Sequence, residues 1–208
     1  MGRHSGRFAL LCVAIALYLS TFAALAHADV VFTNIVGNCC GGYLVGGSHW
    51  GTESLGAEFT PTQSTLFQDA QVVVFTDKGM GDGNFNMYLF SDKGGLPGTP
   101  LANLGTLTAP VGGGILTATG PQIPLNAGTG YWLVLTPYDN DTWVGWEEGG
   151  SSNVSTAWTA DPNGQGSWQH LGPVALQFEI DGVPEPSSIV LMATGMLGVA
   201  GMLRRKLL

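Results

Sequence analysis

The chain has 208 residues and a formal net charge of −8, from 15 acidic and 7 basic side chains. The charges are unevenly spread, because 14 of the acids lie in residues 29–182, where Lys78 and Lys93 are the only basic side chains. A segment this acidic repels phosphate backbones, which excludes nucleic-acid binding through a basic patch. With 32 glycines and 11% charged residues, the composition also differs from that of a cytosolic helical enzyme.

The first 28 residues have the pattern of a secretory signal peptide. Arg3 and Arg7 precede an apolar run over residues 8–25, and Ala26 and Ala28 form a small-x-small cleavage site. The alternative is an uncleaved membrane anchor, because the run of about 18 residues is close to the roughly 20 that span a bilayer. We predict cleavage after Ala28 and export across the inner membrane.

Residues 29–182 are long enough for one domain with its own core. Their short apolar runs are separated by Gly, Pro, Asn and Asp, which is typical of strands joined by turns. The last run, 176–180, alternates, with its apolar side chains on one face and Gln177 and Glu179 on the other. Because no helical period is sustained, we predict an all-β fold, an antiparallel β-sandwich resembling a jelly roll. The expected strands are 30–36, 55–59, 71–76, 85–90, 101–108, 115–119, 131–136, 142–146 and 176–180.

Cys39 and Cys40 are the two cysteines that remain after loss of the signal peptide, and they are adjacent. Neighbouring Cα atoms lie about 3.8 Å apart, below the roughly 4.4–6.8 Å that disulfides use, so a bridge between them would be strained. A strained or intermolecular disulfide and free thiols both stay open. Zinc binding is not expected, because His49 and His170 lie far from any partner with ligand spacing.

Asp77, Asp82 and Asn84 place oxygen atoms on one Gly-rich segment, which could hold Ca²⁺ outside the cell. Their spacing differs from that of an EF-hand, and Asp-Gly-Asn between strands is itself a good turn sequence. The turn interpretation is therefore favoured, here and at 139–141, and no cofactor other than this calcium alternative is expected.

Six tryptophans lie in the acidic segment. Trp143 and Trp146, followed by Glu147 and Glu148, could form a glycan-binding surface, since aromatic rings stack on the apolar faces of sugars and carboxylates accept hydrogen bonds from hydroxyls. The alternative is that they belong to the core, as we expect for Trp132 in its apolar run. Partial exposure is an open question for four of them: Trp143, Trp146, Trp158 and Trp168.

No sequence motif for catalysis is present. The chain lacks a Gly-x-Ser-x-Gly elbow, a phosphate-binding Gly-Lys motif and a His-Glu-x-x-His motif. Glu147 and Glu148 are adjacent, so in a strand they point to opposite faces and cannot act as an acid/base pair. His49 and His170 are best explained as surface or packed side chains. We expect a protein that is not an enzyme.

Residues 183–208 have the pattern of a terminal membrane segment. Pro184, Glu185 and Pro186 precede a segment without charges, 188–203, and the basic end Arg204, Arg205 and Lys206 follows. We predict a short transmembrane helix over 188–203, with the basic end on the cytoplasmic side as a stop-transfer signal. An ordinary single-pass anchor with a Pro-rich stalk is one explanation of this pattern.

The same tripeptide, short apolar segment and basic end resemble the PEP-CTERM sorting signal of Gram-negative bacteria. The resemblance implies that Pro184, Glu185 and Pro186 are recognised by an exosortase, a membrane-embedded protease or transpeptidase that cleaves near them. It also implies that these residues are recognition residues of a substrate rather than a catalytic site. The expected mature form lacks the residues after roughly Glu185.

Three segments of the middle resemble a bacterial extracellular domain called choice-of-anchor R. They are AEFTP at 57–61, YLFSDKGGLPG at 88–98 and LNAGTGYWLVL at 125–135. The resemblance implies a β fold on an exported protein and supplies no catalytic residues.

We therefore expect a non-enzymatic protein of the cell envelope or the extracellular space, sorted by an exosortase. The PEP-CTERM resemblance implies an association with exopolysaccharide or biofilm, which makes extracellular polysaccharide the expected partner. A carbohydrate-binding module with a Trp-rich face is the alternative, and a hydrolase with an unrecognised site is a remote one.

Overall fold

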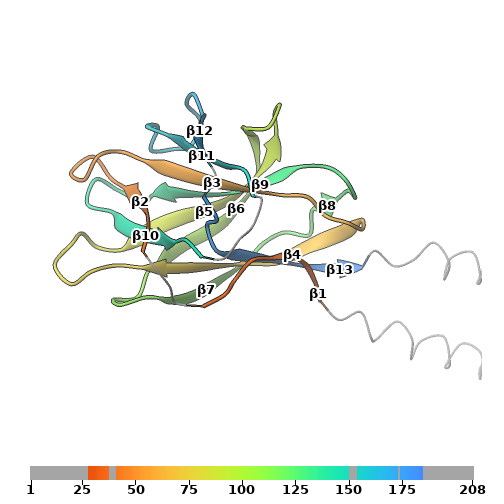
Figure 1. Ribbon diagram of the computed structural model, residues 1–208, viewed down its shortest axis with the longest axis horizontal. Helices are drawn as coiled ribbons and strands as arrows, with labels where there is room; N and C mark the ends of the chain where they lie inside the picture. The colour runs from red at the N-terminus through yellow and green to blue at the C-terminus, as the bar shows by residue number, and fades with distance from the viewer. Residues whose placement is uncertain (1–27, 38–40, 150–153, 173, 185–208) are drawn as a thin grey trace, which may run out of the picture. The chain divides into compact units, whose positions relative to one another are not determined.

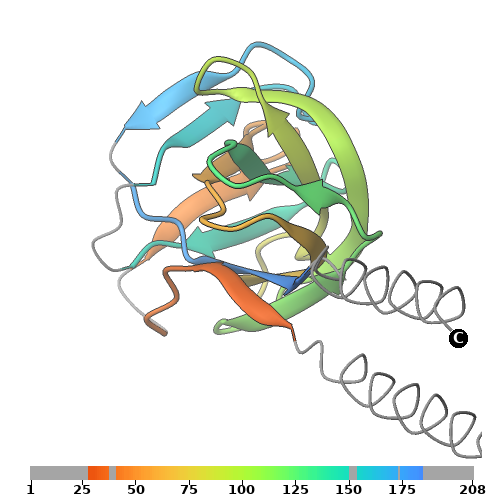
Figure 2. The ribbon, with the colours of Figure 1, turned by 90° about the vertical axis from the view of Figure 1, so that its right-hand side faces the viewer.

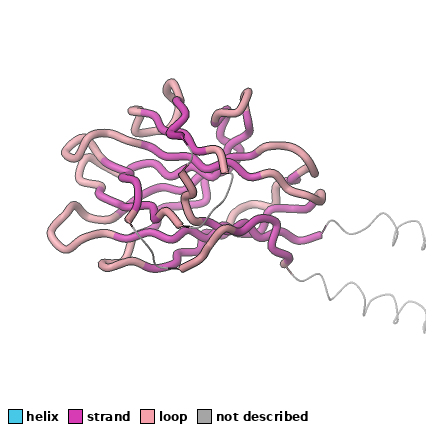
Figure 3. The backbone as a smooth tube through the Cα atoms, viewed as in Figure 1, coloured by secondary structure: helices cyan, strands magenta, loops and turns pink. Residues whose placement is uncertain are grey.

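The computed structural model describes residues 28–37, 41–149, 154–172 and 174–184. Within them, Ala28–Val183 forms one compact unit of strands, turns and loops. The second unit, residues 1–27 and 184–208, lies outside the described part of the chain except for Pro184. The described residues form no helix that could cross a membrane, and the predicted helix 188–203 and signal peptide, apart from Ala28, fall outside them. The all-β prediction is confirmed for the described residues, which Figure 3 shows as strands and loops alone.

One sheet is centred on the 11-residue strand β4 (Thr65–Phe75). Val74 of β4 pairs with Gly114 on one side and with Trp146 on the other, so β4 lies inside the sheet. The other strands of this seven-stranded sheet are β1 (Asp29–Thr33), β2 (Gly42–Gly46), β7 (Gly114–Thr119), β8 (Pro124–Leu125), β10 (Trp143–Glu147) and β13 (Phe178–Pro184). β7 and β8 pair with one edge of β4, while β13 and β10 lie along its other edge and carry β1 and β2.

The other sheet has six strands, all antiparallel to their neighbours. Their order is β12 (Gln169–Gly172), β11 (Thr156–Thr159), β3 (Ser54–Phe59), β9 (Tyr131–Pro137), β5 (Asn84–Asp92) and β6 (Pro97–Thr108). Figure 1 shows β4, β7 and β13 in one layer and β3, β11 and β12 in the other, and Figure 2 shows the strands wrapping around a common interior.

The main core lies between the two sheets and takes apolar side chains from both. Trp146 of β10 and Phe178 of β13 meet there edge to face, with ring centroids 6.3 Å apart, and Phe59 of β3 contacts Phe178 at the same centroid distance. All three side chains are almost fully buried. The aromatic contacts therefore join the two sheets across their facing surfaces.

A second, smaller apolar cluster covers the outer face of the six-stranded sheet. Phe90, Trp132, Val134 and Ala157 are buried in it, beneath the partly buried side chains of Tyr88, Leu96 and Trp168. The indole N–H of Trp132 donates to the Asp92 carboxylate at 2.9 Å. All seven residues of β9 are therefore buried, and the predicted burial of Trp132 is confirmed.

The apolar run 176–180 corrects one prediction. Phe178 and Ile180 are buried as expected, but Gln177, which we placed on the polar face, is 0% exposed. Its side-chain oxygen accepts hydrogen bonds from the Val36 and Gly37 amides at 2.8 and 3.1 Å, and its amide group donates to the Gly37 carbonyl at 3.0 Å. The segment after β1 thus covers Gln177 and satisfies its polar atoms.

Candidate functional site

The sorting tripeptide begins where the last strand ends. Pro184 is the final residue of β13, and the hydroxyl of Thr65 donates to the Val183 carbonyl at 2.7 Å. β13 pairs with β1 so that Gly182 lies opposite Asp29, the first residue after the predicted signal cleavage. The two predicted processing points therefore adjoin one pair of neighbouring strands.

The remaining predicted targeting residues lie mostly outside the described part of the chain. Among them, Ala28 alone is described, and it is exposed. The others are Ala26 of the cleavage site, Glu185 and Pro186 of the tripeptide, and the basic end Arg204, Arg205 and Lys206. Cys39 and Cys40 lie outside the described residues as well.

The predicted glycan-binding pair is wrong for Trp146. This side chain is 0% exposed in the main core, where its indole N–H donates to the Gln177 carbonyl at 2.9 Å. Trp143 lies three residues earlier on β10 and is partly exposed. Since alternate strand residues point to opposite faces, a spacing of three places the two rings on opposite sides of the sheet.

Trp143 contributes instead to the outer face of the seven-stranded sheet. Its ring packs edge to face against the partly exposed Phe75, at a centroid distance of 5.8 Å. Phe75 in turn lies over Gly145, where an added Cβ would come within 2.3 Å of the Phe75 ring. The two rings form a small aromatic platform at one end of this face.

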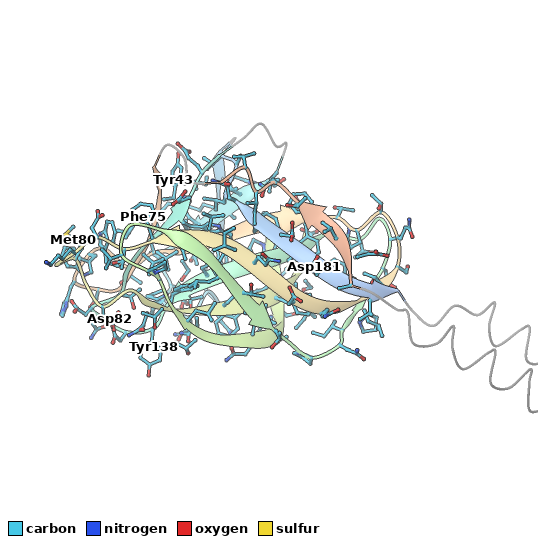
Figure 4. All side chains as sticks on the ribbon, turned by 90° about the horizontal axis from the view of Figure 1, so that it is seen from below. Tyr43, Phe75, Met80, Asp82, Tyr138 and Asp181 are labelled. Atoms are coloured by element: carbon cyan, nitrogen blue, oxygen red, sulfur yellow. The ribbon has the colours of Figure 1, made fainter. Side chains whose placement is uncertain are left out.

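Polar side chains occupy another part of the same face, and Figure 4 shows Asp181 well apart from Phe75. The Gln71 amide donates to Glu179 at 3.1 Å and to Asp181 at 3.4 Å. Partial burial raises the pKa of Asp181, and the neighbouring charge of Asp69 and a hydrogen bond between the two carboxyl groups raise it further, while the hydrogen bond from Gln71 lowers it. Asp181 therefore loses its proton less readily than an isolated aspartic acid does.

The segment with Asp77, Asp82 and Asn84 forms a turn, as favoured. The two carboxylate oxygens of Asp82 accept hydrogen bonds from the backbone and side-chain amides of Asn84, at 2.9 and 2.7 Å. The side-chain oxygen of Asn84 accepts from the Thr108 hydroxyl at 2.6 Å, and Asp77 is exposed. In the described part of the chain, no group of three or more His, Cys, Asp or Glu side chains could hold a metal ion.

The two histidines of the acidic segment are on the surface. His49 approaches the Asp141 carboxylate at 3.5 Å, and both side chains are more than half exposed. His170 on β12 is also exposed. An exposed pair of this kind contributes little to stability and holds neither partner firmly.

An open hollow of about 570 Å³ lies beside β11, where the sequence did not predict a site. Its lining includes an aromatic ring, a proline and four polar side chains: Trp158, Asp161, Pro162, Asn163, Ser167 and Gln169. The sequence signal for it is an aromatic strand residue followed by the turn sequence Asp-Pro-Asn-Gly at 161–164. A turn sequence alone does not reveal that its side chains surround a hollow.

The comparisons with known proteins concern the end of the chain. Residues 182–206 match the model of the PEP-CTERM protein-sorting motif, a match that includes the end of β13. No curated protein matches the sequence. The motif indicates export to the cell envelope in Gram-negative bacteria and processing by an exosortase. The chain therefore carries a PEP-CTERM sorting motif and is an exosortase-targeted, exported protein.

Proposed function

We propose that the β domain is a non-enzymatic module that exosortase processing leaves at the cell surface or in an extracellular polysaccharide matrix. The observation that carries the proposal is the junction between the fold and the sorting motif. The described core lies within Ala28–Val183, and the tripeptide begins at Pro184, the last residue of β13 and of the sheets. Cleavage near Glu185 would therefore release a complete domain, which has the size and core of an autonomous folding unit.

Before processing, the segment 188–203 would hold the precursor in the inner membrane. Mass spectrometry of the form isolated from the envelope or the culture fluid tests this order of events. We expect an N-terminus at Asp29 and a C-terminus near Glu185. A surface form that keeps Arg204, Arg205 and Lys206 would contradict processing by an exosortase.

Two carboxylates of the domain have structural roles. Asp82 completes a turn with Asn84, and Asp92 accepts from the indole of Trp132 and from the Gly95 amide. Asp82 and Asp92 thus accept hydrogen bonds that hold a turn, a loop and the Trp132 ring in place. We further propose that the domain is of the choice-of-anchor R type with jelly-roll connections, a class that accompanies surface anchoring.

A sedimentation assay tests the matrix association directly. The domain Ala28–Val183 is mixed with polysaccharide extracted from the producing bacterium, with calcium or with a chelator. We expect saturable co-sedimentation and no release of reducing ends. Lack of co-sedimentation would overturn the matrix role, and steady release of reducing ends that copurifies with the domain would reveal a hydrolase.

The chelator arm also decides the calcium alternative. If calcium held the segment from Asp77 to Asn84, chelation and the substitution Asp82→Ala would both weaken co-sedimentation. We expect neither to do so, because Asn84 already donates to the two Asp82 carboxylate oxygens.

A carbohydrate-binding module is the second candidate, now without Trp146. The partly exposed rings of Trp143 and Trp158 favour it. Trp143 packs beside Phe75, and Trp158 lies among the polar side chains of the hollow on the other sheet. The two positions can be separated by experiment.

A further inference from the structure

The hollow beside β11 has a rim that the fold fixes in place. The Asp161 carbonyl accepts hydrogen bonds from the Ser54 hydroxyl at 2.7 Å and from the Gly164 amide at 3.1 Å. The Asp161 side chain accepts a hydrogen bond from the backbone N–H of Asn163 at 2.7 Å. A rim that is ordered before a ligand arrives costs less entropy on binding.

The loop of the rim is also fixed from behind. The indole N–H of Trp168 donates to the Gly164 carbonyl at 3.0 Å, and the Trp168 ring packs against the second apolar cluster. At Gly166, an added Cβ would lie 2.7 Å from Asp161 and 3.0 Å from the Thr159 hydroxyl, so the loop depends on glycine for this close approach. The hydrogen bond and the ring packing of Trp168 hold the rim on the sheet.

The side chains that line the hollow combine a ring with hydrogen-bonding groups. Trp158 on β11 is partly exposed and pairs across the strands with Gln169 on β12, so both side chains share one face. Within the described part of the chain, no residue accepts a hydrogen bond from the Trp158 indole N–H. Asn163 and Gln169 are exposed amides, which both donate and accept hydrogen bonds.

These groups fit the chemistry of a sugar. A pyranose ring has an apolar face of C–H groups that can stack on an indole, and an equator of hydroxyls that both donate and accept hydrogen bonds. The volume of about 570 Å³ falls in the range of roughly 300–1,000 Å³ typical of small-molecule sites. It leaves room for one or two pyranose rings.

The charge of the domain selects among sugars. Residues 29–182 hold 14 acidic and 2 basic side chains, and Asp161 lies in the rim itself. This surface repels uronic acids and sulfated sugars and favours neutral ones.

We propose that the hollow beside β11 binds one or two pyranose rings of a neutral polysaccharide, with Trp158 as the stacking platform and Asn163 and Gln169 as hydrogen-bonding partners. The inference rests on the proposed matrix role and names the ligand class and the site. It also moves the binding surface from the predicted Trp143 and Trp146 to a different part of the domain.

The test compares three variants of the domain Ala28–Val183 in the sedimentation assay. Trp158→Ala removes the platform together with a ring that packs against the main core, so its folding is checked by urea denaturation. The double variant Asn163→Ala with Gln169→Ala removes the exposed amides without touching the core. Tyr138→Ala is the control, an exposed aromatic residue in the turn after β9. We expect Trp158→Ala to weaken binding about tenfold or more and the double variant to weaken it several-fold, because buried aromatic anchors dominate most binding energies. The control should bind like the wild type.

A direct measurement separates this site from the matrix role. NMR signals of the indole N–H of Trp158 and of the Asn163 and Gln169 amides are followed during titration with maltotriose, cellotriose and, for comparison, a trimer of galacturonic acid. We expect a neutral trimer to shift these signals and the acidic one to leave them unchanged.

Each outcome has one meaning. If the polysaccharide co-sediments and the double variant binds like the wild type, the hollow is not the site and the proposal is overturned. If the polysaccharide does not co-sediment, the matrix role fails, and the trimer titration alone decides the hollow. Unshifted signals in that titration, or equal shifts with the acidic trimer, would overturn the neutral-sugar site.

Discussion

The outer faces of the two sheets are built in opposite ways. On the six-stranded sheet, Phe90, Trp132 and Val134 point outward and are buried beneath Leu96 and Trp168. On the seven-stranded sheet, the outward side chains include three polar groups that stay partly exposed: Gln71, Glu179 and Asp181. One sheet is thus covered by its own loops, and much of the other faces solvent.

The difference shows how the covered face supports the hollow. The segment 160–168 contributes Trp168 to the second apolar cluster and, a few residues earlier, contributes Asp161 and Asn163 to the rim. Burial of one side chain of the segment therefore orders the others. On the open sheet, Trp143 packs against Phe75 and belongs to no second apolar cluster in the described part of the chain.

Removal of the largest ring of the second cluster should have the largest effect. Trp132→Ala deletes a fully buried indole and its hydrogen bond to Asp92. We expect the free energy of unfolding to fall by about 3–5 kcal/mol, as for other large-to-small changes in cores. Urea denaturation of the domain Ala28–Val183, followed by tryptophan fluorescence, measures it.

The matched variant Trp132→Phe keeps a ring but loses the N–H donor, so a smaller loss of roughly 1–3 kcal/mol is expected. A loss below about 1 kcal/mol for Trp132→Ala would show that the outer cluster does not contribute to the folded core, and the contrast between the two faces would then fail.

The second-largest loss of stability is expected at Gln177, which the segment after β1 covers. Gln177→Ala leaves the Val36 and Gly37 amides and the Gly37 carbonyl without their buried partner. We expect a loss of about 1–3 kcal/mol in the free energy of unfolding, because the hydrogen bonds of a fully buried side-chain amide are lost. The exposed Gln122→Ala serves as control and should change stability by less than about 0.5 kcal/mol. Equal effects of the two substitutions would show that Gln177 is not a buried structural group.

The sequence predicted the strands with a clear apolar pattern. The uninterrupted run in β9 and the alternation in β13 both correspond to strands, because a strand buried on two faces is apolar throughout and a strand buried on one face alternates. The polar strands β11 and β12 were not predicted, since Thr156 to Thr159 and Gln169 to Gly172 resemble loop sequence. Their place in the sheet comes from tertiary pairing with β3.

The candidate site was harder to predict than the fold for the same reason. Trp146 and Gln177 have the sequence surroundings of surface residues, and both are buried by segments distant along the chain. The hollow around Trp158 depends on the cross-strand position of Gln169 and on the closed turn at Asp161. Neither relation is visible in one sequence, whereas the sorting motif is contiguous and was predicted directly.

The smallest effect is expected from the acidic pair on the open face. Asp181 has a pKa raised above the ordinary 3.8 by partial burial and by Asp69, so its ionisation costs more in the folded state than in the unfolded state. The resulting loss of stability begins as the pH rises through about 3.8 and is complete above the raised pKa.

Asp181→Asn should therefore stabilise the domain at neutral pH by less than about 1 kcal/mol, because solvent screens a partly exposed group. The gain should shrink as the pH falls through the raised pKa and vanish below about 3.8. Thermal unfolding at a series of pH values measures it, with the exposed Asp77→Asn as the control for a general reduction of negative charge. An equal gain from the control at every pH would assign the effect to net charge, and a gain that grows toward acid pH would contradict the raised pKa of Asp181.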